Sequence, residues 1–273
     1  MPRERLNDVD INYEVVGAGC PVLMLHGFTG SIAAWQGIPQ KLSREFRVIV
    51  VDMIGHGESS APADPARYSI PGAVDDLQAL LDRLNVEQTA VLGYSMGGRV
   101  ASEMALSAPE RVSSLVLESS GVGIDDQDER AHRAASDEAL ARLIEEQGIE
   151  AFVDRWEAVP LFASQCQLPE RVRRQQRELR MAQKPVGLAN SLRGMGAGMM
   201  EPVSDRLHQF TMPVLYLAGE YDEKYREIGE VICARMPDAS YVEIPRAGHT
   251  IHLEQPESYL EAVISFLRQI ENE

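Results

Sequence analysis

The sequence contains few cysteines, few aromatic residues and no long apolar run. Its three cysteines, Cys20, Cys166 and Cys233, are scattered and match no metal-binding spacing. Isolated thiols of this kind are typical of a reducing compartment, so we predict a cytoplasmic protein and interpret all three as structural or incidental. The first residues run directly into a strand pattern without the apolar stretch of a secretory signal peptide. No apolar run reaches the roughly 18 residues of a membrane helix, so we expect no membrane insertion.

Basic side chains are also scarce, and the net charge is −16 at pH 7. A nucleic-acid-binding surface needs clustered Lys and Arg to neutralise phosphates, so we expect no nucleic-acid partner. The charge does not exclude a small anionic substrate, because exposed charges are screened beyond roughly 8–10 Å at physiological salt. Hydrophobic residues make up 44% of the chain and charged residues 25%, which is typical of a globular protein with a substantial core.

The most informative stretch is a short apolar run, residues 90–92, that ends in Gly93-Tyr94-Ser95-Met96-Gly97. A helical pattern begins directly behind it. Gly-x-Ser-x-Gly between a strand and a helix is typical of a nucleophile elbow, in which the serine lies on a strained turn at the top of a sheet. The glycines would let strand and helix approach closely, and the helix N-terminus would favour an oxyanion. A glycine-rich turn without chemistry is the alternative.

Apolar runs and helical patterns alternate along most of the chain. Buried strands are predicted at residues 22–25, 48–51, 90–92, 115–117 and 214–218, a last strand at 241–244, an edge strand at 11–16, and helices at 35–42, 74–84, 96–107 and 256–270. This alternation predicts an α/β fold with a mostly parallel central sheet and helices on both faces.

The alternation stops between residues 121 and 209, where only helical patterns separated by Gly and Pro occur. We therefore predict a core formed by residues 1–120 and 210–273. Residues 121–209 would form a helical cap (lid) over the active site. Ligands in open α/β sheets bind at the carboxyl ends of the strands, which such a cap would cover.

A serine hydroxyl needs a neighbouring imidazole, oriented by a carboxylate, to act as a nucleophile or base. Behind an elbow of this kind, the partners follow in the order Ser, Asp or Glu, His. Asp222 and His249 each follow a predicted strand, so we predict a catalytic triad of Ser95, Asp222 and His249. Glu220 is an alternative acid, and His252 could line the pocket instead.

An oxyanion hole needs two backbone donors aimed at the developing negative charge. Met96, directly after Ser95, supplies one donor, and Phe28, in the loop after the strand at 22–25, is the natural second. A core aromatic is the alternative interpretation of Phe28, and the two are compatible because only its backbone would act. We interpret His26 as a residue that structures this same loop.

Arginines are the second chemical signal. Arg99 lies one helical turn beyond Ser95, and the predicted cap holds two further groups, which are Arg130 and Arg133, then Arg173, Arg177 and Arg180 at helical spacing. Arginine binds carboxylates bidentately and stays charged when buried, so several together would select a polyanionic substrate. A solvated helix face is the alternative for each of them.

These motifs together resemble the 2-succinyl-6-hydroxy-2,4-cyclohexadiene-1-carboxylate synthases of menaquinone biosynthesis, a family with the α/β-hydrolase fold. The elbow string 93–101 carries part of the resemblance, and the strings at 161–164, 177–180 and especially 187–196 are more specific to this family. The resemblance runs from about His26 to His252. It implies a carbon–oxygen lyase that eliminates pyruvate from 2-succinyl-5-enolpyruvyl-6-hydroxy-3-cyclohexene-1-carboxylate, and it implies no cofactor and no metal.

The resemblance also implies roles for individual residues. Ser95, made basic by the other two triad members, would abstract a proton, and the oxyanion hole would hold the resulting enolate. The carboxylate-binding arginines of the family correspond to Arg99, Arg133 and Arg180, with Arg130 and Arg177 as rivals for the last two. The aromatic residues that would line the pocket are Tyr94, Trp156 and Phe162.

The sequence departs from the family after the glycine-rich string. Residues 197–202, Ala-Gly-Met-Met-Glu-Pro, replace an expected Thr-Gly-x-Gln-Pro-Ser, so Met199, Met200 and Glu201 are uncertain pocket residues. We expect a monomer or small homo-oligomer that binds a small polycarboxylate. A serine hydrolase acting on an ester or a carbon–carbon bond is the alternative function, and a ligand-binding protein without catalysis is a third.

Overall fold

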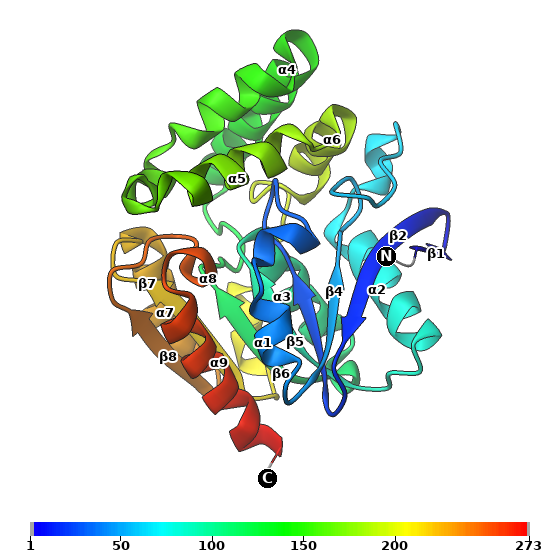
Figure 1. Cartoon of the computed structure of the whole chain (residues 1–273), viewed down its shortest axis with the longest axis vertical. Coiled ribbons are helices and arrows are strands. Elements are labelled where there is room, and N and C mark those ends of the chain that lie inside the picture. Colours follow the sequence, from blue (N-terminus) through cyan, green and yellow to red (C-terminus); the bar gives the residue numbers. More distant parts are fainter. Residues whose placement is uncertain (1–2, 272–273) are drawn as a thin grey trace.

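The computed structural model describes residues 3–271, and eight strands form one sheet within them (Figure 1). The strand order is β1-β2-β4-β3-β5-β6-β7-β8. Pairs β1–β2 and β2–β4 are antiparallel, and all other neighbours are parallel. The strands are β1 (Arg3–Leu6), β2 (Val9–Val16), β3 (Pro21–Leu25), β4 (Arg47–Val51), β5 (Thr89–Tyr94), β6 (Val112–Glu118), β7 (Val214–Gly219) and β8 (Ala239–Ile244). The predicted mostly parallel sheet is confirmed.

One strand prediction was wrong in its place in the sheet. The strand expected at the edge is β2, which has a neighbour on each side, because β1 pairs with it along Arg3–Leu6. This first strand reads Arg-Glu-Arg-Leu and has only one buried side chain. Its sequence does not alternate between hydrophobic and polar residues, so only its backbone pairing with β2 identifies it as a strand.

Helices cover both faces of the sheet. One face packs against α1 (Ile38–Leu42) and α9 (Pro256–Glu271), and the other against α2 (Ile70–Arg83), α3 (Met96–Ser107) and α7 (Glu223–Arg235). The helix expected at residues 35–42 is instead a 3₁₀ turn, Ile32–Trp35, followed by α1. Gln36 and Gly37 separate the two with positive φ angles. Helix α7 was not predicted from the sequence.

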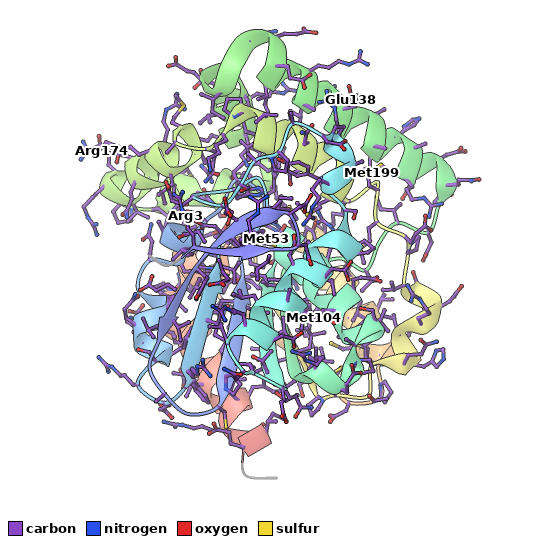
Figure 2. All side chains as sticks on the ribbon, turned by 90° about the vertical axis from the view of Figure 1, so that its right-hand side faces the viewer. Arg3, Met53, Met104, Glu138, Arg174 and Met199 are labelled. Atoms are coloured by element: carbon purple, nitrogen blue, oxygen red, sulfur yellow. The ribbon has the colours of Figure 1, made fainter. Side chains whose placement is uncertain are left out.

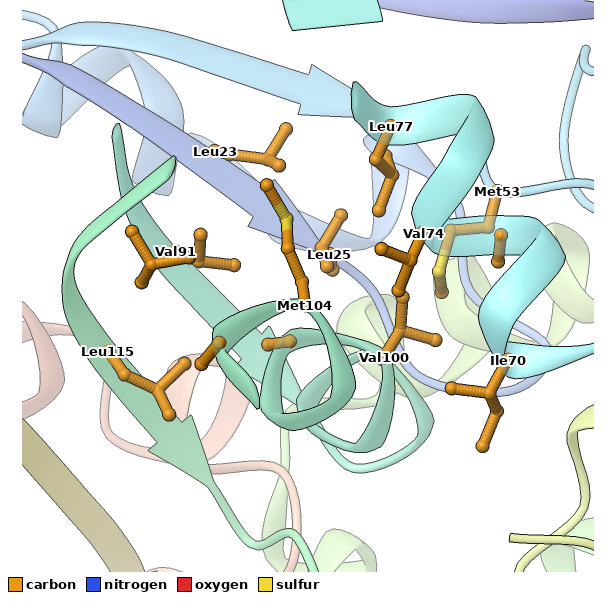
Figure 3. Packing of buried hydrophobic residues seen from close by; sticks show 14 of the residues in the cluster. Leu23, Leu25, Met53, Ile70, Val74, Leu77, Val91, Val100, Met104 and Leu115 are labelled. Atoms are coloured by element: carbon orange, nitrogen blue, oxygen red, sulfur yellow. The ribbon is translucent and has the colours of Figure 1, made fainter. Parts of the chain in front are cut away.

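The elbow helix α3 is held in the centre of one of these layers. Figure 3 shows Val100 and Met104 of α3 facing Leu25 and Val91 of the sheet, with α2 packed alongside. The side chains of Val100 and Met104 are fully buried. Burying such a side chain contributes roughly 1.5–3 kcal/mol, so this packing fixes the direction in which α3 leaves the sheet. The start of α3, where Ser95 lies, is thereby fixed as well.

Helices α4, α5 and α6 lie together at one end of the sheet (Figure 1). They are α4 (Gln127–Glu157), α5 (Glu170–Met181) and α6 (Pro185–Met195), with 3₁₀ turns at Pro160–Gln167 and Ser204–Gln209. Gly148, with φ 85° and ψ 176°, breaks α4 into two parts. No strand occurs between residues 121 and 209. A separate hydrophobic cluster joins α4 to α6 through Ile144, Phe152 and Leu188 among others.

This segment contacts the loops that follow three strands. Gln183 donates to the carbonyl of Gly30 after β3 and accepts from the N–H of Gly57 after β4. Gln165 donates to the hydroxyl of Thr250, in the region after β8. The segment 121–209 therefore lies over the carboxyl ends of the strands. Within the described residues, no helix is long and apolar enough to cross a membrane.

Candidate active site

Ser95 lies between β5 and α3 with φ 51° and ψ −109°, a strained backbone conformation for a residue other than glycine. The close approach of α3 to β3 leaves no space for a side chain at Gly97, where a Cβ would lie 2.2 Å from the carbonyl oxygen of Leu25. The N–H of Ser95 donates to the carbonyl of Glu118 at the end of β6, 2.9 Å away. This is the strained strand–turn–helix geometry of a nucleophile elbow.

The structure brings the three residues of the predicted triad together. His249 Nε2 lies 3.1 Å from Ser95 Oγ, and His249 Nδ1 lies 2.8 Å from Asp222 Oδ2. The side chains of His249 and Asp222 are almost fully buried. The carboxylate can only accept, so Nδ1 carries the proton and Nε2 is left as the acceptor for the serine hydroxyl. The arrangement can therefore withdraw the proton from Ser95.

The alternative acid and base are placed elsewhere. The carboxylate of Glu220 accepts from the backbone N–H of Arg246 in an exposed turn. His252 points to the buried carboxylate of Glu118, with Nδ1 2.8 Å from Oε2. His26 holds its loop, since Nε2 accepts from the N–H of Met53 and Nδ1 donates to the carbonyl of Gly27. Burial lowers the pKa of His26 to about 4, so this ring is neutral at pH 7.

A small cavity of about 60 Å³, room for a few water molecules, lies directly at Ser95 and His249. Both residues predicted for the oxyanion hole, Phe28 and Met96, line it. The aromatic residues expected from the sequence line it too; they are Tyr94, Trp156 and Phe162. The remaining lining residues that the sequence analysis missed are Leu161, Ser191, Leu192, Met195, Gly196 and Tyr225. Four of them, Ser191, Leu192, Met195 and Gly196, could have been found from the sequence. They belong to the string at 187–196 that carries the family resemblance.

Arg99 is the buried cation of this cavity. Its Nη2 donates to the carbonyl of Met195 at 2.8 Å, and its Nε has no hydrogen-bond partner within the described residues. Burial lowers the pKa of Arg99 to about 10, which still leaves the guanidinium charged at neutral pH. A buried cation with a free donor is costly unless an anion pairs with it. Arg99 therefore places a buried positive charge at the wall of this cavity.

Arg133 lines the same cavity, whereas its rival Arg130 does not. Nε of Arg133 donates to Oδ1 of Asp137 at 2.9 Å, and Arg130 donates to the carbonyl of Ile124. Burial raises the pKa of Asp137, and the guanidinium of Arg133 opposes that shift. Of the two candidates, Arg133 has the position from which a bound carboxylate could be reached.

Arg180 lies behind Phe162, 5.4 Å from the centre of that ring, and lines a neighbouring cavity instead of the one at Ser95. Its Nη1 donates to Glu157 at 2.9 Å, and its side chain is buried. Arg177 pairs with Glu157 and Asp154. Both Arg177 and Arg180 line a groove beside α5, but only Arg180 also lines the cavity next to the one at Ser95. The structure thus places Arg180, and not Arg177, at the cavity next to the candidate site, and Phe162 lines both cavities.

Comparisons with known proteins agree on one family. Residues 21–256 match the model of the alpha/beta hydrolase fold. The chain is 42% identical to a Bacillus subtilis (strain 168) protein provisionally named 2-succinyl-6-hydroxy-2,4-cyclohexadiene-1-carboxylate synthase, over 91% of this chain and 90% of the relative. The synthase of that name from Escherichia coli O1:K1 / APEC is 31% identical, over 92% of this chain and 95% of the relative. The chain belongs to the 2-succinyl-6-hydroxy-2,4-cyclohexadiene-1-carboxylate synthase family.

A solved structure of this synthase family supports the same assignment. MenH from S. aureus superposes with a TM-score of 0.91 at 32% identity, and the match covers 96% of this chain and 98% of MenH. The resemblance and the α/β-hydrolase fold predicted from the sequence are therefore confirmed.

The segment in which this synthase-family member departs from the expected pattern lies away from the cavity at Ser95. Met199 is 52% exposed, Met200 is buried in the hydrophobic core of the sheet layer, and Glu201 is exposed. None of the three lines that cavity. The departure at 197–202 therefore falls on an exposed position and a core position outside that cavity.

Within residues 3–271, no group of three or more His, Cys, Asp or Glu side chains is placed to hold a metal ion. Cys20 and Cys166 are exposed free thiols, and Cys233 is a partly buried one.

Proposed function

We propose that this chain eliminates pyruvate from 2-succinyl-5-enolpyruvyl-6-hydroxy-3-cyclohexene-1-carboxylate and releases 2-succinyl-6-hydroxy-2,4-cyclohexadiene-1-carboxylate. The observation that carries the proposal is the buried cation Arg99, which lines the same cavity as the Ser95–His249 pair. A base next to a buried cation suits a substrate that must both bind through carboxylates and lose a proton. The similarity to relatives that bear this activity's name runs over more than nine-tenths of the chain, which supports the proposal.

Ser95 is the base in this mechanism, with His249 and Asp222 as its support. His249 Nε2 takes the hydroxyl proton of Ser95, and the negative charge of Asp222 stabilises the imidazolium that forms. The serine oxygen then removes the ring proton next to the succinyl ketone, and the charge moves onto the ketone oxygen as an enolate. The backbone N–H groups of Phe28 and Met96 would stabilise that oxygen.

Collapse of the enolate completes the elimination. The electron pair returns through the ring and shifts the existing double bond. The carbon–oxygen bond to the enolpyruvyl group then breaks, and the leaving enolate takes up one proton to become pyruvate. The ring is left with two double bonds, so atoms and charge balance without a cofactor. Arg99 and Arg133 would hold substrate carboxylates, and Arg180 would act after Phe162 moves aside.

Substrate access requires a change in the segment 121–209. Pockets for ligands of this size have volumes of about 300–1,000 Å³, whereas the cavity at Ser95 has about 60 Å³. We therefore propose that residues 121–209 form a cap that moves relative to a core of residues 1–120 and 210–273. The three free cysteines suit the cytoplasmic location that we also propose.

The decisive experiment measures pyruvate release from the enzymatically generated tricarboxylate precursor, coupled to lactate dehydrogenase. We expect rapid release by the unmodified protein and none above background by Ser95→Ala. Arg174→Ala is a matched control, because that side chain projects outward from α5 (Figure 2) and lies at an exposed position. Absence of pyruvate release by the unmodified protein would contradict the proposal.

A serine hydrolase is the second candidate, because the same triad geometry could open an ester or a carbon–carbon bond. The two functions differ in what they do with p-nitrophenyl esters. The lyase should barely hydrolyse them, since the small cavity at Ser95 holds a buried cation suited to a carboxylate. Fast ester hydrolysis without pyruvate release would assign the hydrolase function.

A further inference from the structure

A second buried histidine–carboxylate pair lies beside the candidate triad, between Glu118 and His252. Glu118 ends β6, is fully buried, and accepts two kinds of hydrogen bond from His252. One comes from the backbone N–H at 3.0 Å, and the other comes from ring Nδ1 at 2.8 Å. Together, these bonds fix both the main chain and the ring orientation of His252.

The same residue also holds the nucleophile. The carbonyl oxygen of Glu118 accepts the N–H of Ser95 at 2.9 Å. His252 follows His249 by three residues, so one residue of β6 is hydrogen-bonded to Ser95 through its main chain and to the His249 segment through its side chain. Glu118 therefore links the chain at Ser95 to the chain at His252 through buried hydrogen bonds. This link bears on the 3.1 Å distance between Ser95 Oγ and His249 Nε2.

Packing around His252 restrains the connection further. Its ring lies 4.4 Å from the ring of Trp35 and 4.9 Å from the ring of Tyr94, the residue before the nucleophile. The ring of Tyr94 lies 5.4 Å from that of His249, and its hydroxyl is 2.8 Å from Thr250 Oγ1. The ring of Tyr94 therefore contacts both histidines from the nucleophile's own strand.

Another carboxylate near His249 cannot replace this connection. Glu254 accepts the N–H groups of Gly248 and Thr250, on either side of His249. All of these groups belong to one continuous stretch of chain, so Glu254 shapes the loop internally without fixing it relative to Ser95. Glu118 comes from a different strand, the one paired directly with β5, and it sets that relation.

We propose that Glu118 is a positioning residue that sets the distance between His249 and Ser95 by holding His252. It lines neither the cavity at Ser95 nor the neighbouring one, so it touches no substrate in this role. The proposal rests on the proposed triad but not on the lyase reaction. Any reaction that needs His249 to activate Ser95 will depend on Glu118, including reactions with a substrate-independent probe.

The test uses a fluorophosphonate, which phosphonylates a serine only when its histidine accepts the proton. The serine oxygen forms a bond to phosphorus, fluoride leaves, and the hydroxyl proton passes to His249. We expect Glu118→Ala to slow phosphonylation by about 10- to 100-fold, because small misplacements of reacting groups have effects of that order. Glu118→Gln should recover most of the rate, since its amide oxygen still accepts from the N–H of His252.

The matched control is Glu110→Ala, which removes an exposed carboxylate just before the opposite end of the same strand and should react at the unmodified rate. Circular dichroism melting of each variant reports stability. A merely structural role would lower the Tm of Glu118→Ala while the folded protein kept its phosphonylation rate. That outcome would overturn the proposal, as would an unchanged rate in every Glu118 variant.

Substitutions of His252 separate positioning from proton transfer. The amide nitrogen of Asn can occupy the place of Nδ1 and donate to Glu118, so His252→Asn should react within a few-fold of the unmodified protein. His252→Leu cannot donate from its side chain and should be slow. Equal loss in both variants would assign the chemistry to the imidazole and contradict the proposal. Failure of pyruvate release with normal phosphonylation would remove the lyase function and leave this inference intact.

Discussion

The triad residues Ser95, Asp222 and His249 follow strands of one sheet, whereas Arg133 and Arg180 lie on helices of the segment 121–209. The first group is held by hydrogen bonds within the sheet layers. The second group is held by ion pairs to carboxylates of its own segment, Asp137 and Glu157. Arg99 stands between the groups, because it lies on α3 but bonds to Met195 of α6.

The difference indicates what each region contributes. A proton transfer needs reacting atoms held within a few tenths of an ångström, which the sheet and its buried loops provide. Recognition of carboxylates tolerates exchange of partners, because an arginine that pairs with Asp137 or Glu157 can pair with a substrate carboxylate at similar geometry. We therefore propose that the sheet sets the reaction, and that the segment 121–209 selects the substrate together with Arg99 of α3.

The largest expected effect comes from substituting a residue of the triad, which the sheet holds in place. Ser95→Ala should lower kcat for pyruvate release by on the order of 1,000-fold or more, because removal of a triad residue costs at least that much. The Tm should stay close to that of the unmodified protein, since Ser95 is only partly buried. Retention of more than a tenth of the activity would contradict the role of Ser95 as base.

Arg99→Ala tests the residue that joins the two regions. We expect kcat/KM to fall about 100-fold, or on the order of 3 kcal/mol, because a substrate carboxylate would be buried without its partner. Arg99→Lys restores the charge without the planar fork and should recover only part of the loss. Unchanged catalytic efficiency in Arg99→Ala would show that no carboxylate binds there.

A smaller effect is expected for the arginine of α4. Arg133→Ala should raise KM about tenfold with kcat little changed, because one hydrogen-bonded charge pair is worth roughly 1.5 kcal/mol. Arg130→Ala is the matched control, since it lies three residues earlier on the same helix and outside the cavity. If the two variants exchanged their effects, the assignment of Arg133 would be wrong.

The smallest effect concerns the stability of the sheet loops. Burial lowers the pKa of His26 to about 4 and that of His56 to about 3, while the unfolded chain keeps values near 6.5. The unfolded state therefore binds more protons below neutral pH, and stability rises with pH. From pH 7 to pH 6, the free energy of unfolding should fall by about 1 kcal/mol, with little change above pH 8.

The measurement is urea unfolding followed by fluorescence of Trp35 in a Trp156→Phe background. The two tryptophans lie in different regions, Trp35 beside the sheet and Trp156 on α4, so this variant reports the sheet layers alone. A free energy that stays constant between pH 8 and pH 6 would show that neither histidine is held neutral by the fold.

Sequence patterns predicted the buried strands because each is a continuous apolar run. They predicted the order of the triad because each member follows a predicted strand. They missed β1, because its residues are mostly polar and only its backbone pairing with β2 makes it a strand. They also missed Tyr225, which reaches the cavity from α7. Contacts such as those between Glu118 and His252 join residues 134 positions apart, and no local periodicity reports them.

The segment 121–209 leaves the sheet after β6 and returns at β7, and these two strands are direct neighbours in parallel register. Nothing inserted at this point needs to cross the sheet or interrupt its hydrogen bonding. Both junctions can stay fixed while the intervening helices are lengthened, shortened or exchanged. A chimaera that carries the corresponding segment of another α/β hydrolase should therefore retain the sheet and its elbow, which makes this junction a natural point for redesigning substrate range.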